Sequence, residues 1–276
     1  MKIITDTSAL YSLQEGKELG IEVIPACALV DGVVYRDYED ISSEEFLKLM
    51  KQGKVPTSSQ PAIGDVINIF EGTQEDILYL TIGDGLSGTY QNAIGARNSV
   101  EQNEHINIID TQTLAGAQRY LVQKAMRLKK EGVRIEEIVR QIKKSVVTSA
   151  SFVIPSDFSF LKRSGRLTPI AAAICSVIKI IPVLTQTEDR KRIKPFVIKR
   201  SHKKAVDSVV DYFKEMRVNH EYIISIGHAG VRQLAEDVMK QIRTHFIDTT
   251  IEILQLSPTL ITHGGPGCIT IQAICR

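Results

Sequence analysis

One segment constrains the fold of this chain more than any other: an apolar run that leads directly into a glycine-rich turn and then into a helix-forming stretch. Residues 78–93 read Leu-Tyr-Leu-Thr-Ile-Gly-Asp-Gly-Leu-Ser-Gly-Thr-Tyr-Gln-Asn-Ala. We expect a buried strand, a tight turn and a helix. The first N–H groups of a helix have no acceptor inside it and attract a carboxylate or phosphate. Ser87 and Gly88 stand where such an anion would arrive.

The rest of the chain alternates apolar runs with stretches in which apolar residues recur at helical spacing. This order predicts an α/β fold with a mostly parallel sheet. The periodicity predicts helices over residues 43–51, 115–130 and 135–147. Residues 22–30 read as one strand and residues 57–60 as part of a turn-rich loop.

The length of 276 residues suits two domains. We expect a mostly parallel sheet in an N-terminal α/β domain over residues 1–150. A smaller α/β domain should follow over residues 151–276, with a ligand site between the two. Open parallel sheets hold their ligands at loops that follow the carboxyl ends of strands.

Composition excludes some classes of function. A net charge of +2 with 24% charged residues lacks the strong basic excess typical of nucleic-acid-binding domains. The N-terminus has no signal-peptide pattern, and the most apolar run, residues 169–184, is too short to span a bilayer, so we expect a cytoplasmic protein. Four cysteines, without a CxxC pair, indicate free thiols and no metal site: Cys27, Cys175, Cys268 and Cys275.

Three loops carry the polar groups from which a site could be built. The first is Thr57-Ser58-Ser59-Gln60, the second is Ser87-Gly88, and the third is His263 followed by Gly-Gly-Pro-Gly. Each also has a structural interpretation, as a helix cap or a tight turn. Neither a Walker-type phosphate loop nor a cofactor motif is present.

Two catalytic hypotheses remain open from these residues alone. The first is a serine hydrolase or acyltransferase with Ser87 as nucleophile, His263 as base and Asp6 or Asp110 as the orienting acid, although Gly-Leu-Ser-Gly lacks the full Gly-x-Ser-x-Gly elbow. The second is a phosphocarrier or small-substrate subunit with a reactive histidine. A non-catalytic binding protein is the third possibility.

The loops, taken in order, resemble the DegV family. The matching segments are Ser58-Ser59-Gln60-Pro61, Gly85 to Gln91 (Gly-Leu-Ser-Gly-Thr-Tyr-Gln), Leu161 to Arg166 (Leu-Lys-Arg-Ser-Gly-Arg), Lys179 to Leu184 (Lys-Ile-Ile-Pro-Val-Leu), and His263 with Gly265-Pro266-Gly267. These segments span nearly the whole chain.

The resemblance implies a carrier that encloses one long-chain fatty acid in a tunnel between two domains, uses no cofactor, and presents the carboxylate to a separate fatty acid kinase. The resulting acyl phosphate would then go toward phospholipid synthesis. By resemblance, Ser58, Ser87, the Gly88 amide and His263 would hold the carboxylate, with Thr57 or Ser59 as less favoured candidates. A protonatable His263 would also favour an anion.

The resemblance also concerns the surface. It implies that Arg166 and its loop dock the kinase, and basic side chains could contact a membrane surface during loading. Two departures from the family pattern stand out. Asp84 precedes the glycine turn, where its charge would repel an anion if it faced inward, so we expect it to face solvent. Gln118 and Arg119 stand where the family usually has further glycines, so we expect packing or access near the pocket to differ.

Overall fold

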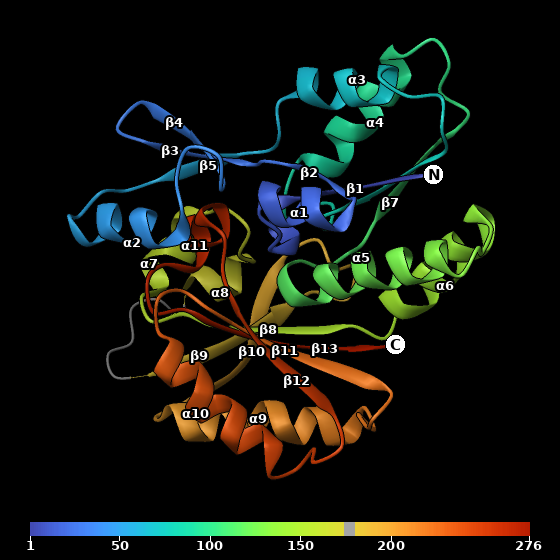
Figure 1. Ribbon diagram of the computed structural model, residues 1–276. Helices are drawn as coiled ribbons and strands as arrows, with labels where there is room; N and C mark the ends of the chain where they lie inside the picture. The colour runs from blue at the N-terminus through green and yellow to red at the C-terminus, as the bar shows by residue number, and fades with distance from the viewer. Residues whose placement is uncertain (174–179) are drawn as a thin grey trace.

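The computed structural model describes residues 1–173 and 180–276, which form an α/β fold with three sheets (Figure 1). The predicted fold class is confirmed. The strands are β1 (Lys2–Asp6), β2 (Glu22–Ile24), β3 (Cys27–Val30), β4 (Val33–Arg36), β5 (Thr57–Ser59), β6 (Ile77–Thr81), β7 (Ile106–Asp110), β8 (Ala150–Ile154), β9 (Ile181–Gln186), β10 (Ile193–Lys199), β11 (Tyr222–His228), β12 (Thr250–Gln255) and β13 (Ile269–Cys275). The helices are η1 (Thr7–Ala9), α1 (Leu13–Leu19), α2 (Ser43–Lys51), α3 (Ile63–Glu71), α4 (Thr89–Ser99), α5 (Ala115–Lys130), α6 (Ile135–Val146), α7 (Phe158–Arg163), α8 (Pro169–Ala173), α9 (His202–Glu215), α10 (Arg232–Arg243) and α11 (Pro258–Gly264).

The first sheet is entirely parallel, in the order β2-β1-β6-β7, as expected for the N-terminal half. Its central strands are apolar on both faces because helices cover both. In β6, Leu78 and Leu80 face a core shared with α5 and α6, whereas Ile77 and Tyr79 face α3 and α4. A strand that is buried on both faces has a continuous apolar sequence instead of alternating polar and apolar residues, and the sequence of β6 shows this pattern.

The second sheet has six strands in the order β10-β9-β8-β13-β11-β12, and only its β11–β12 pair is parallel. The α10 helix supplies the crossover that this parallel pair requires. Helices α9 and α10 cover one face (Figure 1). The boundary near residue 150 stays a prediction, although the two large sheets draw their strands from opposite sides of it.

The third sheet has the strand order β4-β3-β5. Two predictions made from the sequence of its strands are wrong. Residues 22–30 are not one strand: Pro25 lacks a backbone N–H, and the chain passes there from β2 in the parallel sheet to β3 in the small one. Residues 57–59 form a strand instead of a loop, because β5 pairs antiparallel with β3. Their hydroxyl-rich sequence gave no signal for this pairing.

The described cysteines, Cys27, Cys268 and Cys275, are free thiols. Cys175 and Lys179 lie outside the described residues. Within residues 1–173 and 180–276, no helix is both long enough and apolar enough to cross a bilayer.

Helix α5 lies between the two large sheets and contacts both. Its buried side chains share one core with strands β1 and β6 of the parallel sheet and with Ile223 and Ile274 of the six-stranded sheet. Gly116, at its N-terminal end, allows the closest approach: a Cβ atom there would overlap the Ser225 side chain of β11. The spacing between the sheets therefore depends on the absence of this side chain.

Asp37 fixes α11 to the N-terminal half of the chain. Its fully buried carboxylate accepts hydrogen bonds from the Thr259 backbone N–H at 3.1 Å, from the Thr259 hydroxyl at 2.9 Å and from the Thr7 hydroxyl at 3.1 Å. Because Thr259 lies in the first turn of α11, the carboxylate satisfies a helix N–H that has no acceptor within the helix. This contact positions the helix that carries His263.

The close approach at Gly116 gives a first prediction. Gly116→Ala should lower the free energy of unfolding by about 1–3 kcal/mol, because the added methyl group forces α5 away from β11. Gly95→Ala in α4 is the matched control, since a Cβ there meets nothing nearer than 3.8 Å. It should raise stability by up to about 1 kcal/mol through helix propensity. Chemical denaturation measures both, and equal effects would contradict the packing argument.

The buried carboxylate of Asp37 gives a second prediction. Burial raises the pKa of Asp37 from 3.8 to about 7, so between these values the folded protein holds a proton that the unfolded chain has released. The free energy of unfolding should therefore fall as pH rises through this window, with a contribution from Asp37 of at most about 4 kcal/mol.

Asp37→Asn should flatten this pH dependence, because its amide has no charge to bury and its oxygen can still accept from Thr259. Urea unfolding at several pH values between roughly 4 and 8 measures the slope. Asp248→Asn, at an exposed residue outside the network, is the control. A slope unchanged in Asp37→Asn would show that this carboxylate does not carry the effect.

Candidate functional site

Ser58 and His263 meet although they lie 205 residues apart. The Ser58 hydroxyl and His263 Nε2 form a hydrogen bond of 2.7 Å. In β5, successive side chains point to opposite faces of the small sheet. Ser58 therefore faces His263, while Thr57 and Ser59 point to the other face and are exposed. The pleat thus favours Ser58 over its two neighbours.

The short helix α11 carries His263 in its last turn. Ser257 caps its N-terminus by accepting from Leu260 N–H, and Pro258 occupies the first helical position, where no backbone donor is needed. The helix packs against β3 and β5 of the small sheet. His263 therefore sits on a helix held at its start by Asp37 and along its side by the sheet that carries Ser58.

The glycine turn forms a second polar group of the site. Gly88 precedes α4, which has no side-chain cap, and the Gly88 N–H donates to no acceptor among the described residues. The Ser87 hydroxyl bonds the Thr89 hydroxyl at 2.9 Å and accepts from Thr89 N–H. A Cβ on Gly88 would lie 3.1 Å from the Gln60 amide oxygen, so the segment after Ser58 reaches this turn.

Gln60 is a candidate that the sequence analysis did not single out, although it lies in the first of the three loops. Its side chain lies close to Gly88, and the neighbouring Pro61 carbonyl accepts from the Asn92 side chain at 2.9 Å. The segment from Ser58 to Pro61 therefore runs along the start of α4. The structure brings the first two predicted loops together at the helix opening.

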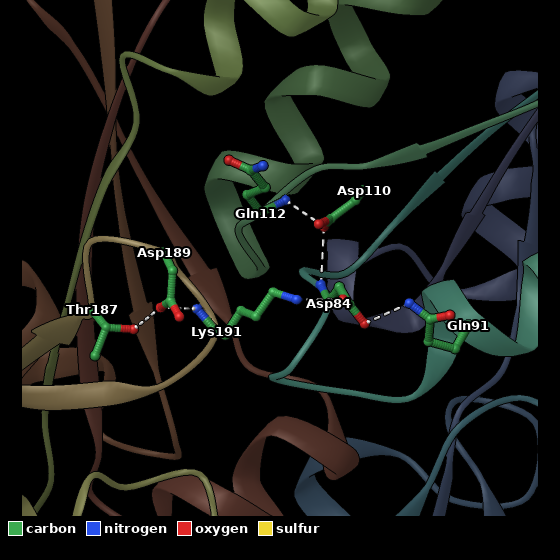
Figure 2. A network of polar contacts seen from close by, with 7 residues as sticks. All are labelled: Asp84, Gln91, Asp110, Gln112, Thr187, Asp189 and Lys191. Atoms are coloured by element: carbon green, nitrogen blue, oxygen red, sulfur yellow. Dashed lines mark hydrogen bonds and ion pairs between the residues drawn. The ribbon is translucent and has the colours of Figure 1, made fainter.

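Asp84 does not face solvent, contrary to the expectation. Its carboxylate forms an ion pair with Lys191 at 3.3 Å and accepts from Gln91, and its side chain is 15% exposed (Figure 2). Its backbone N–H donates to the Asp110 carboxylate, which also accepts from Gln112 N–H (Figure 2). Asp84 is absent from the cavity wall, and Lys191 compensates its charge.

Gln118 and Arg119, the second departure from the family pattern, also lie away from the cavity. Gln118 is buried and donates to the Asp6 carboxylate, while Arg119 lies over the Tyr11 ring and pairs with Glu15. Neither residue lines the cavity. Their expected effect on packing or access near the pocket stays a prediction.

A mainly apolar cavity lies beside His263 and is lined by residues from both halves of the chain. It encloses about 790 Å³ with its open mouth included. Its wall includes Ile82, Leu86, Leu161, Leu184, Ile193 and Leu260. Ser58, Ser87 and Gly88 are not part of this wall, but His263 is the partner of the first and Leu86 adjoins the second.

Arg166 lies in the same wall. Its Nε donates to the Leu86 carbonyl at 3.0 Å, and Nη1 donates to the Ser164 carbonyl. Within the described residues the half-buried guanidinium has no carboxylate partner. Desolvation lowers its pKa, and its charge acts on His263. The residue expected to dock a partner thus also contributes an unpaired positive charge beside the cavity.

His263 is neutral in this arrangement. Burial, and to a lesser degree the nearby Arg166 charge, lower the pKa of His263 to about 3. The expectation that a protonated His263 favours a bound anion stays a prediction, because this pKa belongs to the protein without its ligand. Any attraction by a full positive charge at this end of the cavity comes from Arg166.

The surroundings of the imidazole also indicate its tautomer. Nδ1 is buried and has no hydrogen-bond partner. A buried N–H without an acceptor is costly, so the proton is better placed on Nε2, which faces the Ser58 oxygen. In that tautomer the imidazole donates to Ser58, and the Ser58 O–H remains free to donate to a carboxylate.

The catalytic arrangement considered for Ser87 is not assembled. His263 bonds Ser58, whereas the Ser87 hydroxyl bonds Thr89. The Asp6 carboxylate accepts from Ser8 and Ile82 N–H groups, and Asp110 accepts from Asp84 and Gln112. Neither carboxylate reaches His263, so no nucleophile, base and acid form a chain.

Comparison with known proteins supports the family resemblance. The family model described as "Uncharacterised protein, DegV family" matches residues 1–276. A DegV domain-containing protein of Halalkalibacterium halodurans is 32% identical over 98% of this chain and 96% of its own length.

Solved structures resemble the fold over its full length. A DegV family protein from Thermus thermophilus, described by its fatty acid binding, has a TM-score of 0.90 at 22% identity, covering 100% of this chain and 99% of its own. A fatty acid binding DegV family protein from Streptococcus agalactiae has a TM-score of 0.88 at 25% identity, covering 100% and 98%. The match of sequence and fold from end to end shows that this chain belongs to the DegV family.

Proposed function

We propose that this protein binds one long-chain fatty acid, with its tail in the apolar cavity and its carboxylate at the meeting point of β5, α11 and the start of α4. The observation that carries the proposal is the mainly apolar cavity whose wall includes His263 and Arg166. An apolar cavity with a few convergent polar groups at one end suits an amphipathic ligand. Relatives described as fatty acid binding support the same conclusion.

The head group decides whether such a carrier can compete with a membrane. Burial of an acyl tail gains about 0.8 kcal/mol per methylene, but a bilayer offers the same gain. Hydrogen bonds to an ionised carboxylate contribute about 1.5–3 kcal/mol each. We expect the Ser58 hydroxyl, the Gly88 amide and Ser87 to supply them, and His263 to hold the Ser58 oxygen in place.

Arg166 would balance the charge of the ligand. Without a carboxylate partner, its half-buried guanidinium favours an anion at this end of the cavity. A bound carboxylate would in turn raise the pKa of His263. An acyl phosphate carries more negative charge, and the same cation would favour it as well.

We further propose that a separate kinase phosphorylates the carboxylate in the cytoplasm and that the protein then carries the acyl phosphate toward phospholipid synthesis. This step rests on the family resemblance and on the absence of a Walker-type phosphate loop from the sequence. Docking of the kinase at Arg166 and its loop, and a transient contact with the membrane during loading, belong to the same proposal.

The head-group assignment predicts a difference between adjacent residues. Ser58→Ala should weaken fatty acid binding roughly ten- to a hundredfold, because it removes one charge-assisted hydrogen bond. Thr57→Ala is the matched control, since its hydroxyl points to the opposite face of the small sheet. Competition against a fluorescent fatty acid measures both affinities, with urea unfolding as the check on folding. Equal losses in the two variants, or no loss in Ser58→Ala, would contradict the assignment.

A further inference from the structure

A second pocket, unconnected with fatty acid binding, lies between α5, α6 and the end of β13. It encloses about 610 Å³ with its open mouth included, and its lining includes Lys124, Lys144, Ser145, Thr148 and Arg276. No residue of this lining also lines the apolar cavity. The two pockets are therefore separate.

The floor of this pocket holds a buried cation without a counter-charge. Lys124 is 6% exposed, and its ammonium donates to the Ser145 hydroxyl at 2.9 Å. Over residues 1–173 and 180–276, no carboxylate pairs with it. A buried charge is normally paired, and a hydroxyl oxygen alone does not neutralise an ammonium. The ammonium retains donors for a further acceptor.

Other positive charges surround Lys124. Desolvation lowers the pKa of Lys124, and repulsion from Arg127 and Lys144 lowers it further. Arg140 and Glu137 in the lining neutralise one another at 2.6 Å. Lys144 has no carboxylate partner in the part of the chain that the structure describes, and neither has Arg276, whose guanidinium donates to the Thr250 hydroxyl of β12. The lining thus keeps three cations and no free acidic side chain.

Positive charge is in excess over the whole of helices α5 and α6 and the loop between them. Residues 115–146 contain nine basic and three acidic side chains, whereas the whole chain has a net charge of only +2. The remaining residues are therefore acidic on balance. This helix pair lies at the opposite side of the molecule from α7, α8 and α11 (Figure 1). Residues 162–204, with twelve basic and two acidic side chains, are a second positively charged part of the chain.

We propose that this pocket is a binding site for a phosphate group, with Lys124, Lys144 and Arg276 as its cationic ligands. A phosphate offers several acceptor oxygens and up to two negative charges, which suit a lining that carries three cations. The Thr148 and Ser145 hydroxyls provide additional polar contacts. The phosphate could belong to a free small molecule or to a lipid head group, and both share the chemistry that the pocket recognises.

Calorimetric titration of the full chain with inorganic phosphate tests the proposal, with sodium chloride at equal ionic strength as the reference. The wild-type protein should bind one phosphate, and Lys124→Met should weaken this binding at least tenfold. Lys144→Met is the second variant, at an exposed residue of the lining that tolerates substitution. Fatty acid affinity should be unchanged in both variants.

Lys130→Met is the matched control, because Lys130 is an exposed lysine of α5 outside the pocket lining. It removes the same charge from the same helix pair and should leave phosphate binding within twofold of the wild type. Equal weakening in Lys130→Met, or no phosphate binding beyond that of chloride, would overturn the proposal. Either result would indicate diffuse attraction instead of a site.

Sedimentation with vesicles of phosphatidic acid in phosphatidylcholine distinguishes the two sources of phosphate. If the ligand is a lipid head group, the wild-type protein should bind these vesicles, and Lys124→Met should lose both vesicle and phosphate binding. If the ligand is a free compound, the wild-type protein should not bind the vesicles, and Lys124→Met should lose phosphate binding alone. Both outcomes support the pocket, whereas retention of phosphate binding by Lys124→Met and Lys144→Met would refute it.

Discussion

The hydrogen bond between Ser58 and His263 is the contact on which the proposed site depends. It joins β5, a strand near the start of the chain, to α11, a helix near its end. Two other contacts make this geometry stable: pairing of β5 with β3, and the Asp37 carboxylate at the first turn of α11. If either shifted, the hydroxyl and the imidazole would separate, and the cavity would lose its polar end.

Electrostatics around this contact suit an anionic ligand better than an empty pocket. His263 is neutral because burial and Arg166 both oppose its protonation. Arg166 itself lacks a carboxylate partner within the described residues, and the Gly88 amide has no acceptor there. Asp84, the nearest acidic residue of the turn, is paired with Lys191 (Figure 2). A carboxylate placed here would satisfy donors that the protein leaves open.

The sequence predicted much of the fold because long periodic segments determine their own structure. The limits of α5 and α2 were predicted to the residue, and the parallel sheet followed from its apolar strands. The small sheet was missed because β5 is a run of hydroxyl residues whose pairing with β3 is a tertiary effect. Pro25 indicates the break between β2 and β3, but the apolar pattern on both sides of it led to the prediction of one strand.

The candidate site was only partly predictable from sequence. The three polar loops were identified, and the structure brings Ser58 to His263 and Gln60 to Gly88. The neutral state of His263 and the inward position of Arg166 were not foreseen, since both follow from burial that only the folded chain defines. Residues of the cavity wall come from many elements, and no local pattern unites them.

A crystal structure of the protein loaded with a long-chain fatty acid tests the central claim most directly. The account predicts electron density for the carboxylate within hydrogen-bond distance of Ser58 Oγ and the Gly88 amide. It also predicts that the tail follows the cavity between Leu161 and Leu184. A carboxylate bound elsewhere, or a tail lying outside this cavity, would contradict the account.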